Sequence, residues 1–235
     1  MKIQSVHIRN YRKLKNCHID FGEKETVLVG ANNSGKTSAI SAIVWFLKNT
    51  DRFTLKEFTA TNWASINEIG EKWLEHDSVD EALLSSHQWD NIVPSMDVWI
   101  NVEDGEQYRV NHLIPSLISW DGKKVGVRGQ YEPTDIKKLY TVYKEAKLKA
   151  KALEDTEEWE KAGSPELYPK NLCDFLGKGL NLREYFDVKY YIIDPALDPD
   201  NEDEVQITPD NEIGNNPLDG LIKVDTILAS RDLSD

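Results

Sequence analysis

Eight residues near the N-terminus, Gly30 to Thr37, match the phosphate-binding pattern G-x-x-x-x-G-K-[ST]. Glycines in this pattern let the main chain turn its N–H groups toward phosphate oxygens. Lys36 supplies a positive charge for the β- and γ-phosphates, and the hydroxyl of Thr37 can bind Mg²⁺. Because such a loop joins a strand to the start of a helix, the match constrains the fold as well as the ligand.

The segments on either side of the loop have the composition of a strand and a helix. Residues 26–29, Thr-Val-Leu-Val, form a short β-branched run that predicts a strand buried on both faces. Residues 38–47 are apolar nearly all round, which predicts a helix buried on all sides. The start of that helix offers unpaired N–H groups and the positive end of a dipole to an anion. We therefore predict that ATP and Mg²⁺ bind at Gly30, Asn32, Asn33, Ser34, Gly35, Lys36, Thr37 and Ser38.

Length and composition are typical of a globular protein. A chain of 235 residues suits one domain, or one domain with a substantial insertion, and its seven tryptophans help to build a core. It has no run of about 18 apolar residues that would predict a transmembrane helix. The N-terminus lacks the apolar segment of a signal peptide. The cysteines, Cys17 and Cys173, have no spacing typical of zinc or a disulfide framework. We expect a reduced, cytoplasmic protein without a membrane partner.

The net charge of −13 argues against a broad basic surface, on which non-specific affinity for nucleic acid depends. One predicted helix nevertheless gathers six lysines: Lys137, Lys138, Lys144, Lys147, Lys149 and Lys151. We interpret them as a solvated helical face that is balanced by the acidic stretch at 154–158.

Alternation of apolar and polar residues predicts antiparallel strands in two parts of the chain. Val6 and Ile8 alternate with polar residues, and the same period recurs at 17–21, so a strand pair should precede the loop. A second region at about 96–131 reads as a β-meander, with strands at 96–102, 108–112, 117–120 and 125–127 and hairpin signals at Asp104-Gly105 and Asp121-Gly122. This pattern argues against a simple doubly wound, kinase-like fold.

Helical spacing predicts two further helices, one around Ile66 to Leu74 and one capped by Thr134 or Asp135. The second begins a helical arm at about 134–186 and could run towards Trp159. Residues 188–193 are apolar, and residues 224–228 predict a last short strand. The acidic loop at 198–204 is read as a solvated turn rather than a metal site.

A second acidic centre for hydrolysis is missing from the sequence. A P-loop ATPase needs an apolar strand that ends in Asp, often followed by Glu, to hold Mg²⁺ and polarise the attacking water. The nearest match runs from Tyr190 to Asp194, but Pro195 stands where the Glu is expected. No Leu-Ser-Gly-Gly signature occurs. The chain thus carries a nucleotide-binding element without a convincing hydrolytic one, and its catalytic residues are not assigned.

The N-terminal residues resemble the ABC-type ATPase heads of the SMC, RecF and OLD (overcoming lysogenisation defect) group. Ile8 to Leu14, Ile-Arg-Asn-Tyr-Arg-Lys-Leu, is similar to their opening strand motif I-x-N-F/Y-R-x-F/L, and the loop at 30–38 is close to the form favoured in OLD-like ATPases. The resemblance implies that Arg12 contacts the nucleotide, with a surface arginine as the alternative. It also makes Gln88 a weak candidate for sensing Mg²⁺, with a surface loop glutamine as the alternative.

The resemblance implies an α/β fold, a P-loop NTPase of ABC/RecF-like type with a mixed sheet around the loop helix, an antiparallel meander and a helical insertion. Residues 1–235 would be the N-terminal portion of one such head, incomplete for hydrolysis alone. Its expected partners are a second copy or the remaining ATPase and Toprim half, with DNA bound through the complete assembly in DNA repair or antiviral defence. The alternatives are a stand-alone nucleotide-binding regulatory or interaction protein and a self-sufficient small NTPase, which the missing acidic strand disfavours.

Overall fold

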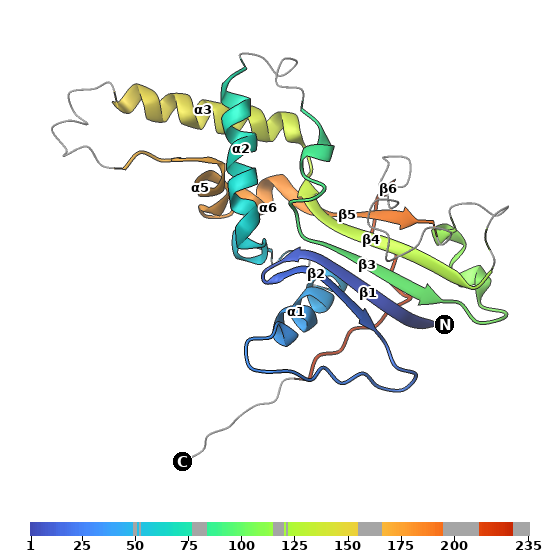
Figure 1. The fold of residues 1–235 in the computed structure, drawn as a ribbon. Coiled ribbons are helices and arrows are strands. Elements are labelled where there is room, and N and C mark those ends of the chain that lie inside the picture. The colour runs from blue at the N-terminus through green and yellow to red at the C-terminus, as the bar shows by residue number, and fades with distance from the viewer. Residues whose placement is uncertain are drawn as a thin grey trace.

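The computed structural model describes residues 1–48, 51, 53–76, 84–114, 120, 122–154, 166–194 and 212–227. Within them, six strands form one sheet in the order β2-β1-β3-β4-β5-β6, and every neighbouring pair is antiparallel (Figure 1). The strands are β1 (Lys2–Tyr11), β2 (Leu14–Asp20), β3 (Ser95–Asn101), β4 (Lys124–Pro133), β5 (Phe186–Ile193) and β6 (Glu212–Ile213). The α-helices are α1 (Lys36–Leu47), α2 (Trp63–Leu74), α3 (Ile136–Glu154), α5 (Leu172–Gly177) and α6 (Asn181–Tyr185).

One face of the sheet is apolar and is covered by α1. Val6 on β1 lies opposite Val98 on β3, which lies opposite Val127 on β4, and all three side chains are buried. Since side chains alternate between the two faces of a strand, these residues share one face. Helix α1 contacts β1, β2 and β3, and its Phe46 approaches β4 so closely that a Cβ on Gly129 would lie 3.1 Å from the ring.

The opposite face of the sheet carries buried charge. Asp97 on β3 pairs with Arg128 on β4 and with Arg9 on β1, which donates to Asp97 at 2.7 Å. His7, also on β1, lies beside Arg9, whose Nη2 is 2.8 Å from Nδ1 of the imidazole. Strands β1, β3 and β4 are therefore joined by side-chain ion pairs as well as by main-chain hydrogen bonds.

Helices α2, α3, α5 and α6 lie together at one end of the sheet (Figure 1). The predicted helix around 66–74 is confirmed as α2, and its buried Trp73 contacts the rings of Tyr140 and Tyr143 on α3. The cap of α3 is also confirmed, because Asp135 accepts a hydrogen bond from the main-chain N–H of Lys138 at 2.9 Å. Within the described residues, no helix combines the length and the apolar character needed to cross a membrane.

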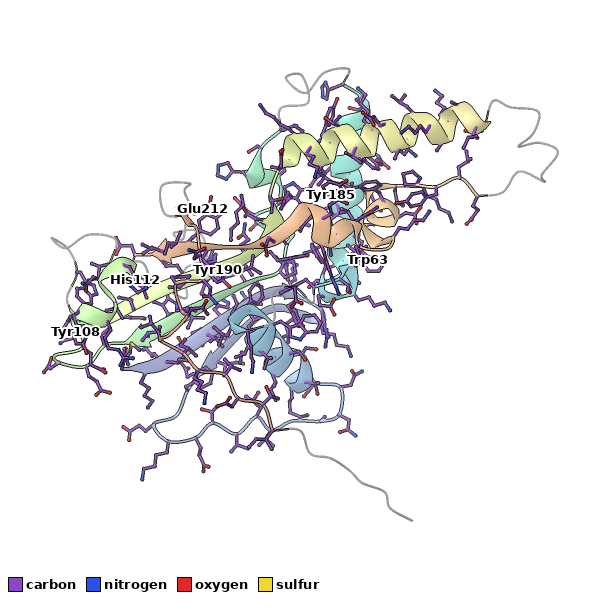
Figure 2. All side chains as sticks on the ribbon, turned by 180° about the vertical axis from the view of Figure 1, so that it is seen from behind. Trp63, Tyr108, His112, Tyr185, Tyr190 and Glu212 are labelled. Carbon is purple, nitrogen blue, oxygen red and sulfur yellow. The ribbon has the colours of Figure 1, made fainter. Side chains whose placement is uncertain are left out.

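The meander prediction is right in part. The predicted strands at 96–102 and 125–127 are β3 and β4, but these pair directly with each other. The strand predicted at 108–112 is wrong: this stretch holds two 3₁₀ turns, η5 (Gln107–Arg109) and η6 (Asn111–Leu113). Val110 and Leu113 are the buried residues, so the true apolar spacing is three, the repeat of a 3₁₀ helix, and not two. Figure 2 shows Tyr108 and His112 at the opposite end of the sheet from Trp63 and Tyr185.

The strand predicted at 26–29 is wrong as well. No strand is assigned to residues 24–30, and Val27 is 71% exposed and Val29 88%. A strand buried on both faces needs a neighbour to pair with and a layer on each side, and no described strand pairs with this segment. The sheet, which the resemblance implies to be mixed, is antiparallel throughout its described strands.

Two other predictions near α1 need correction. The helix itself forms at Lys36–Leu47, but it is not buried on all sides, since Ile40 is 51% exposed. The strand predicted from Val224 onwards does not form in its described part: residues 222–227 have no regular structure. The sequence also indicates a helical turn at Asp80 to Leu84, and all of it except Leu84, which has no regular structure, lies outside the described residues. The predictions for 117–119, for a continuation of α3 to Trp159, for the acidic loop at 198–204 and for residue 228 lie outside them as well.

Candidate nucleotide-binding site

The loop at Gly30–Lys36 turns back on itself before α1 begins. Asn33 and Gly35 both adopt the left-handed backbone region, with φ of 69° and 97°. Gly35 is the N-cap of α1, and a side chain there would be strained, since this region favours glycine. At Gly30, a Cβ would lie 2.9 Å from Oγ of Ser34, so a larger residue at this position would require the Ser34 side chain to move.

The ammonium of Lys36 lies inside this turn. It donates to the carbonyl oxygens of Gly30 and Ala31, both at 2.7 Å, and to Oγ of Ser34 at 3.2 Å. All three acceptors are neutral, so they orient the ammonium without cancelling its charge. The loop thus concentrates a positive charge at its centre.

The first turn of α1 adds to the attraction for an anion. It contains no acidic residue, and no side chain caps its N-terminus. The unpaired N–H groups and the dipole of this 12-residue helix therefore point toward the same region as Lys36. Thr37 and Ser38 lie in this turn, with the Thr37 side chain exposed. The residues that the motif predicts are thus brought together, and their arrangement fits a phosphate group with Mg²⁺ held at the hydroxyl of Thr37.

The guanidinium of Arg12 is engaged by residues outside the loop. Its Nη2 donates to Oε1 of Glu57 at 3.2 Å, and its Cζ lies 5.3 Å from the ring centroid of Trp45 on α1. A similar distance, 5.3 Å, separates Cζ from the ring of Tyr11. Glu57 is itself buried and also closes a capping box with Thr54. Sequence reasoning missed Glu57, because nothing in the opening motif indicates an acidic partner 45 residues further on.

Gln88 and Asp194 lie away from the loop in the fold. Gln88 ends the 3₁₀ turn η4 (Ser86–Gln88), next to Trp89, whose ring packs on Phe186 of β5. Asp194 follows β5, whose Tyr190 donates a hydrogen bond at 3.1 Å to the carbonyl of Phe46. Phe46 belongs to the last turn of α1, whereas the loop precedes its first turn. Strand β5 therefore meets α1 at the end opposite the candidate site.

Lys13 was not predicted as a site residue, yet it contacts the loop directly. Its Nζ donates to Oδ1 of Asn33. The only sequence signal was its place after Arg12, at a variable position of the opening motif. Leu14 also contacts the loop, since a Cβ on Gly35 would lie 2.9 Å from its Cδ2.

A glycine-rich loop that places a lysine at the N-terminus of a helix packed on a β-sheet defines a P-loop nucleotide-binding protein. The family described as AAA ATPase domain matches residues 1–194, and the chain belongs to that family. Its fold is accordingly that of an α/β P-loop ATPase, and nucleotide binding is the property that the family implies.

Two individual proteins are similar to parts of the chain. Over 43 residues it is 37% identical to the DNA replication and repair protein RecF of Picosynechococcus sp., a match that covers 18% of this chain and 11% of RecF. The chain thus spans about a tenth of that relative. A solved structure, described as "Structural biochemistry of ATP-driven dimerization and DNA stimulated activation of SMC ATPases", matches 56% of this chain and 64% of its own, with 17% identity. The TM-score of this match is 0.29.

Proposed function

We propose that this chain is the ATP-binding N-terminal segment of an OLD/RecF-like ATPase that acts in DNA metabolism or phage defence. The observation that carries the proposal is the position of Lys36, whose ammonium is held by neutral oxygens at the uncapped start of α1. Similarity to a protein named for DNA replication and repair supports the link to DNA.

The site residues have separate tasks in this proposal. Main-chain N–H groups from Asn32 to Ser38 cradle the phosphates, and Lys36 neutralises the charge of the β- and γ-phosphates. Thr37 holds Mg²⁺, which would supply further charge neutralisation. Arg12 and Gln88 are kept as weaker candidates, for a nucleotide contact and for sensing Mg²⁺.

Hydrolysis requires residues that the described part of the chain does not bring to the loop. Among the described strands, none pairs with the segment before the loop. Within the described residues, the printed contacts of the Lys36 ammonium are to neutral oxygens and not to a carboxylate. The exposed valines at 27 and 29 support a missing neighbour, because a β-branched run of this kind gains its stability from a paired strand and a covering layer. We infer that a second copy, or the remaining ATPase and Toprim half, completes the head.

Calorimetric titration with ATP and Mg²⁺ tests the nucleotide site. The unmodified chain should bind, and Lys36→Ala should abolish binding, because it removes the charge at the centre of the loop. Lys24→Ala is the matched control: it removes one exposed lysine from the turn before the loop and should bind like the unmodified chain. Equal binding by the Lys36 variant and the control would refute the site. Circular dichroism of each variant shows whether the fold is kept.

A turnover assay tests the proposed dependence on further residues. The chain alone should hydrolyse ATP at a negligible rate, whereas a rate in the usual enzyme range of about 1–10³ per second would contradict this part of the proposal.

Sedimentation with and without Mg²⁺ and ATP then tests association. Tight nucleotide binding without any nucleotide-dependent assembly, even with the downstream half added, would favour a stand-alone regulatory protein instead.

A further inference from the structure

The turn between β1 and β2 is fixed in place beside the loop. Tyr11 pairs with Leu14 across it, so only Arg12 and Lys13 form the turn. The main-chain N–H of Arg12 donates to the carbonyl of Glu57 at 2.7 Å, and its guanidinium pairs with the carboxylate of the same residue. Just before the turn, the carbonyl of Asn10 accepts a hydrogen bond from Thr59 at 3.1 Å. Both main-chain and side-chain contacts therefore fix the position of the turn.

This anchoring gives the two basic residues of the turn different surroundings. Arg12 has an acidic partner and two aromatic rings beside it. Lys13 is exposed, and its ammonium extends to the side chain of Asn33, 20 residues further along the chain. Asn33 contributes only a neutral amide oxygen to this contact. The charge of Lys13 is therefore held at the rim of the loop without being cancelled by that partner.

We propose that Lys13 is a second phosphate-contacting cation of the nucleotide site and favours nucleoside triphosphates over diphosphates. The inference rests on the proposed function, since it requires a nucleotide in the loop. Lys36 supplies positive charge from within the loop, and Lys13 supplies it from the adjoining turn. A triphosphate carries more negative charge than a diphosphate, so an additional cation beside the phosphates stabilises it more.

Moving the ammonium of Lys13 from the Asn33 side chain to a phosphate has a low energetic cost. Its side chain is already at the surface, so contact with a phosphate requires little further desolvation. The contact that it gives up is with a neutral oxygen, whereas hydrogen bonds between an ammonium and a phosphate are charge-assisted and stronger. Because the new pair remains partly solvated, its contribution should be that of an exposed ion pair, about three- to fivefold in affinity, and it should weaken with salt.

Two substitutions at Lys13 separate its charge from its hydrogen bond. Lys13→Gln keeps a donor for Asn33 but removes the charge, while Lys13→Arg keeps the charge. Lys15→Gln is the matched control, because Lys15 is an exposed lysine two residues away on β2. Calorimetric affinities for ATP and for ADP, each with Mg²⁺, are measured for all four proteins at low and at high salt. Thermal unfolding without nucleotide reports whether each variant is folded.

We expect Lys13→Gln to weaken ATP binding about three- to fivefold and ADP binding less. Lys13→Arg should preserve the preference for ATP, and the control should keep the affinities of the unmodified chain. Equal effects of the two Gln variants, or equal losses in Lys13→Gln and Lys13→Arg, would overturn the assignment of Lys13. If Lys36→Ala still abolishes binding in that case, the proposed function stands without Lys13. Failure of the unmodified chain to bind either nucleotide would overturn both.

Discussion

The guanidinium of Arg128 on β4 forms a bidentate ion pair with the carboxylate of Asp97 on β3. Nη2 lies 2.8 Å from Oδ2, and Nε donates to Oδ1. The two residues are direct partners in the antiparallel register, and Arg9 approaches the same carboxylate from β1. Burial by itself would raise the pKa of Asp97, but the charges and hydrogen bonds of the two arginines outweigh it and hold the pKa below its usual value.

Substitution of Asp97 by Asn should therefore destabilise the fold strongly. It leaves the guanidinium groups of Arg128 and Arg9 without their shared counter-charge in a buried place, which typically costs about 3–5 kcal/mol. Urea unfolding followed by fluorescence measures the loss. Asp20→Asn, at the exposed end of β2, is the control and should change the free energy of unfolding by less than about 0.5 kcal/mol. A similarly small loss for Asp97→Asn would mean that solvent reaches this ion pair.

His7 should make stability depend on pH near neutrality. Burial lowers its pKa, and the charge of Arg9 adds to this effect, whereas a hydrogen bond with Asn16 and the charge of Asp97 oppose it. Above about pH 6.5, the ordinary pKa of histidine, neither the folded nor the unfolded state binds the proton. As the pH falls below that value, only the unfolded state gains it, so stability falls until the lowered folded pKa is reached.

The test compares urea unfolding at pH 7.5 and at pH 5.5. The unmodified chain should lose more stability on acidification than His7→Gln, which lacks the titrating group. The difference between the two proteins isolates His7 from all other titrating groups. Identical losses in both proteins would show that His7 is not protected from protonation in the fold.

Gly126 on β4 makes room for the indole of Trp99 on β3. A Cβ at Gly126 would lie 2.4 Å from the ring, while the ammonium of Lys124 lies 4.4 Å from the ring centroid and encloses it further. We expect Gly126→Ala to destabilise the fold by about 1–3 kcal/mol, since overpacking forces the ring or the strand to move. Gly214→Ala should be tolerated, because among the described residues, apart from its two chain neighbours, no atom lies within 4 Å of its added Cβ. Equal stability of the two variants would contradict the close packing of Trp99.

The sequence predicts those parts of the structure that depend on neighbouring residues alone, namely the loop and strands such as β1. The glycines and Lys36 are fixed by spacing within eight residues, and the alternation at Val6 and Ile8 specifies β1 without reference to the rest of the chain. Contacts between distant residues could not be read in this way. The pairing of Arg12 with Glu57 and the reach of Lys13 to Asn33 depend on how the β1–β2 turn is placed against other segments. The direct pairing of β3 with β4 similarly depends on contacts between segments that are distant in the sequence. The alternation of apolar and polar residues within each strand does not specify its partner.

The segment before the loop shows the reverse case, in which a clear local pattern did not produce its element. Val27 and Val29 have strong preferences for a strand, but a strand gains its stability from neighbouring strands and covering layers. Leu28 between them packs against the core. The two valines are therefore exposed in the isolated chain, and substitutions can test that exposure.

Replacing both valines by lysine should leave the stability of the isolated chain within about 0.5 kcal/mol of the original, because little packing is lost. The same change should reduce self-association, which sedimentation velocity measures, since it removes exposed apolar surface from a segment that pairs with no described strand. Leu28→Ala is the contrasting control, with an expected loss of about 1 kcal/mol or more from its contact with the core. If the double lysine variant is instead as unstable as Leu28→Ala, the valines are buried in solution. A concentration-dependent stability of the unmodified chain would then indicate that a second copy supplies the pairing strand.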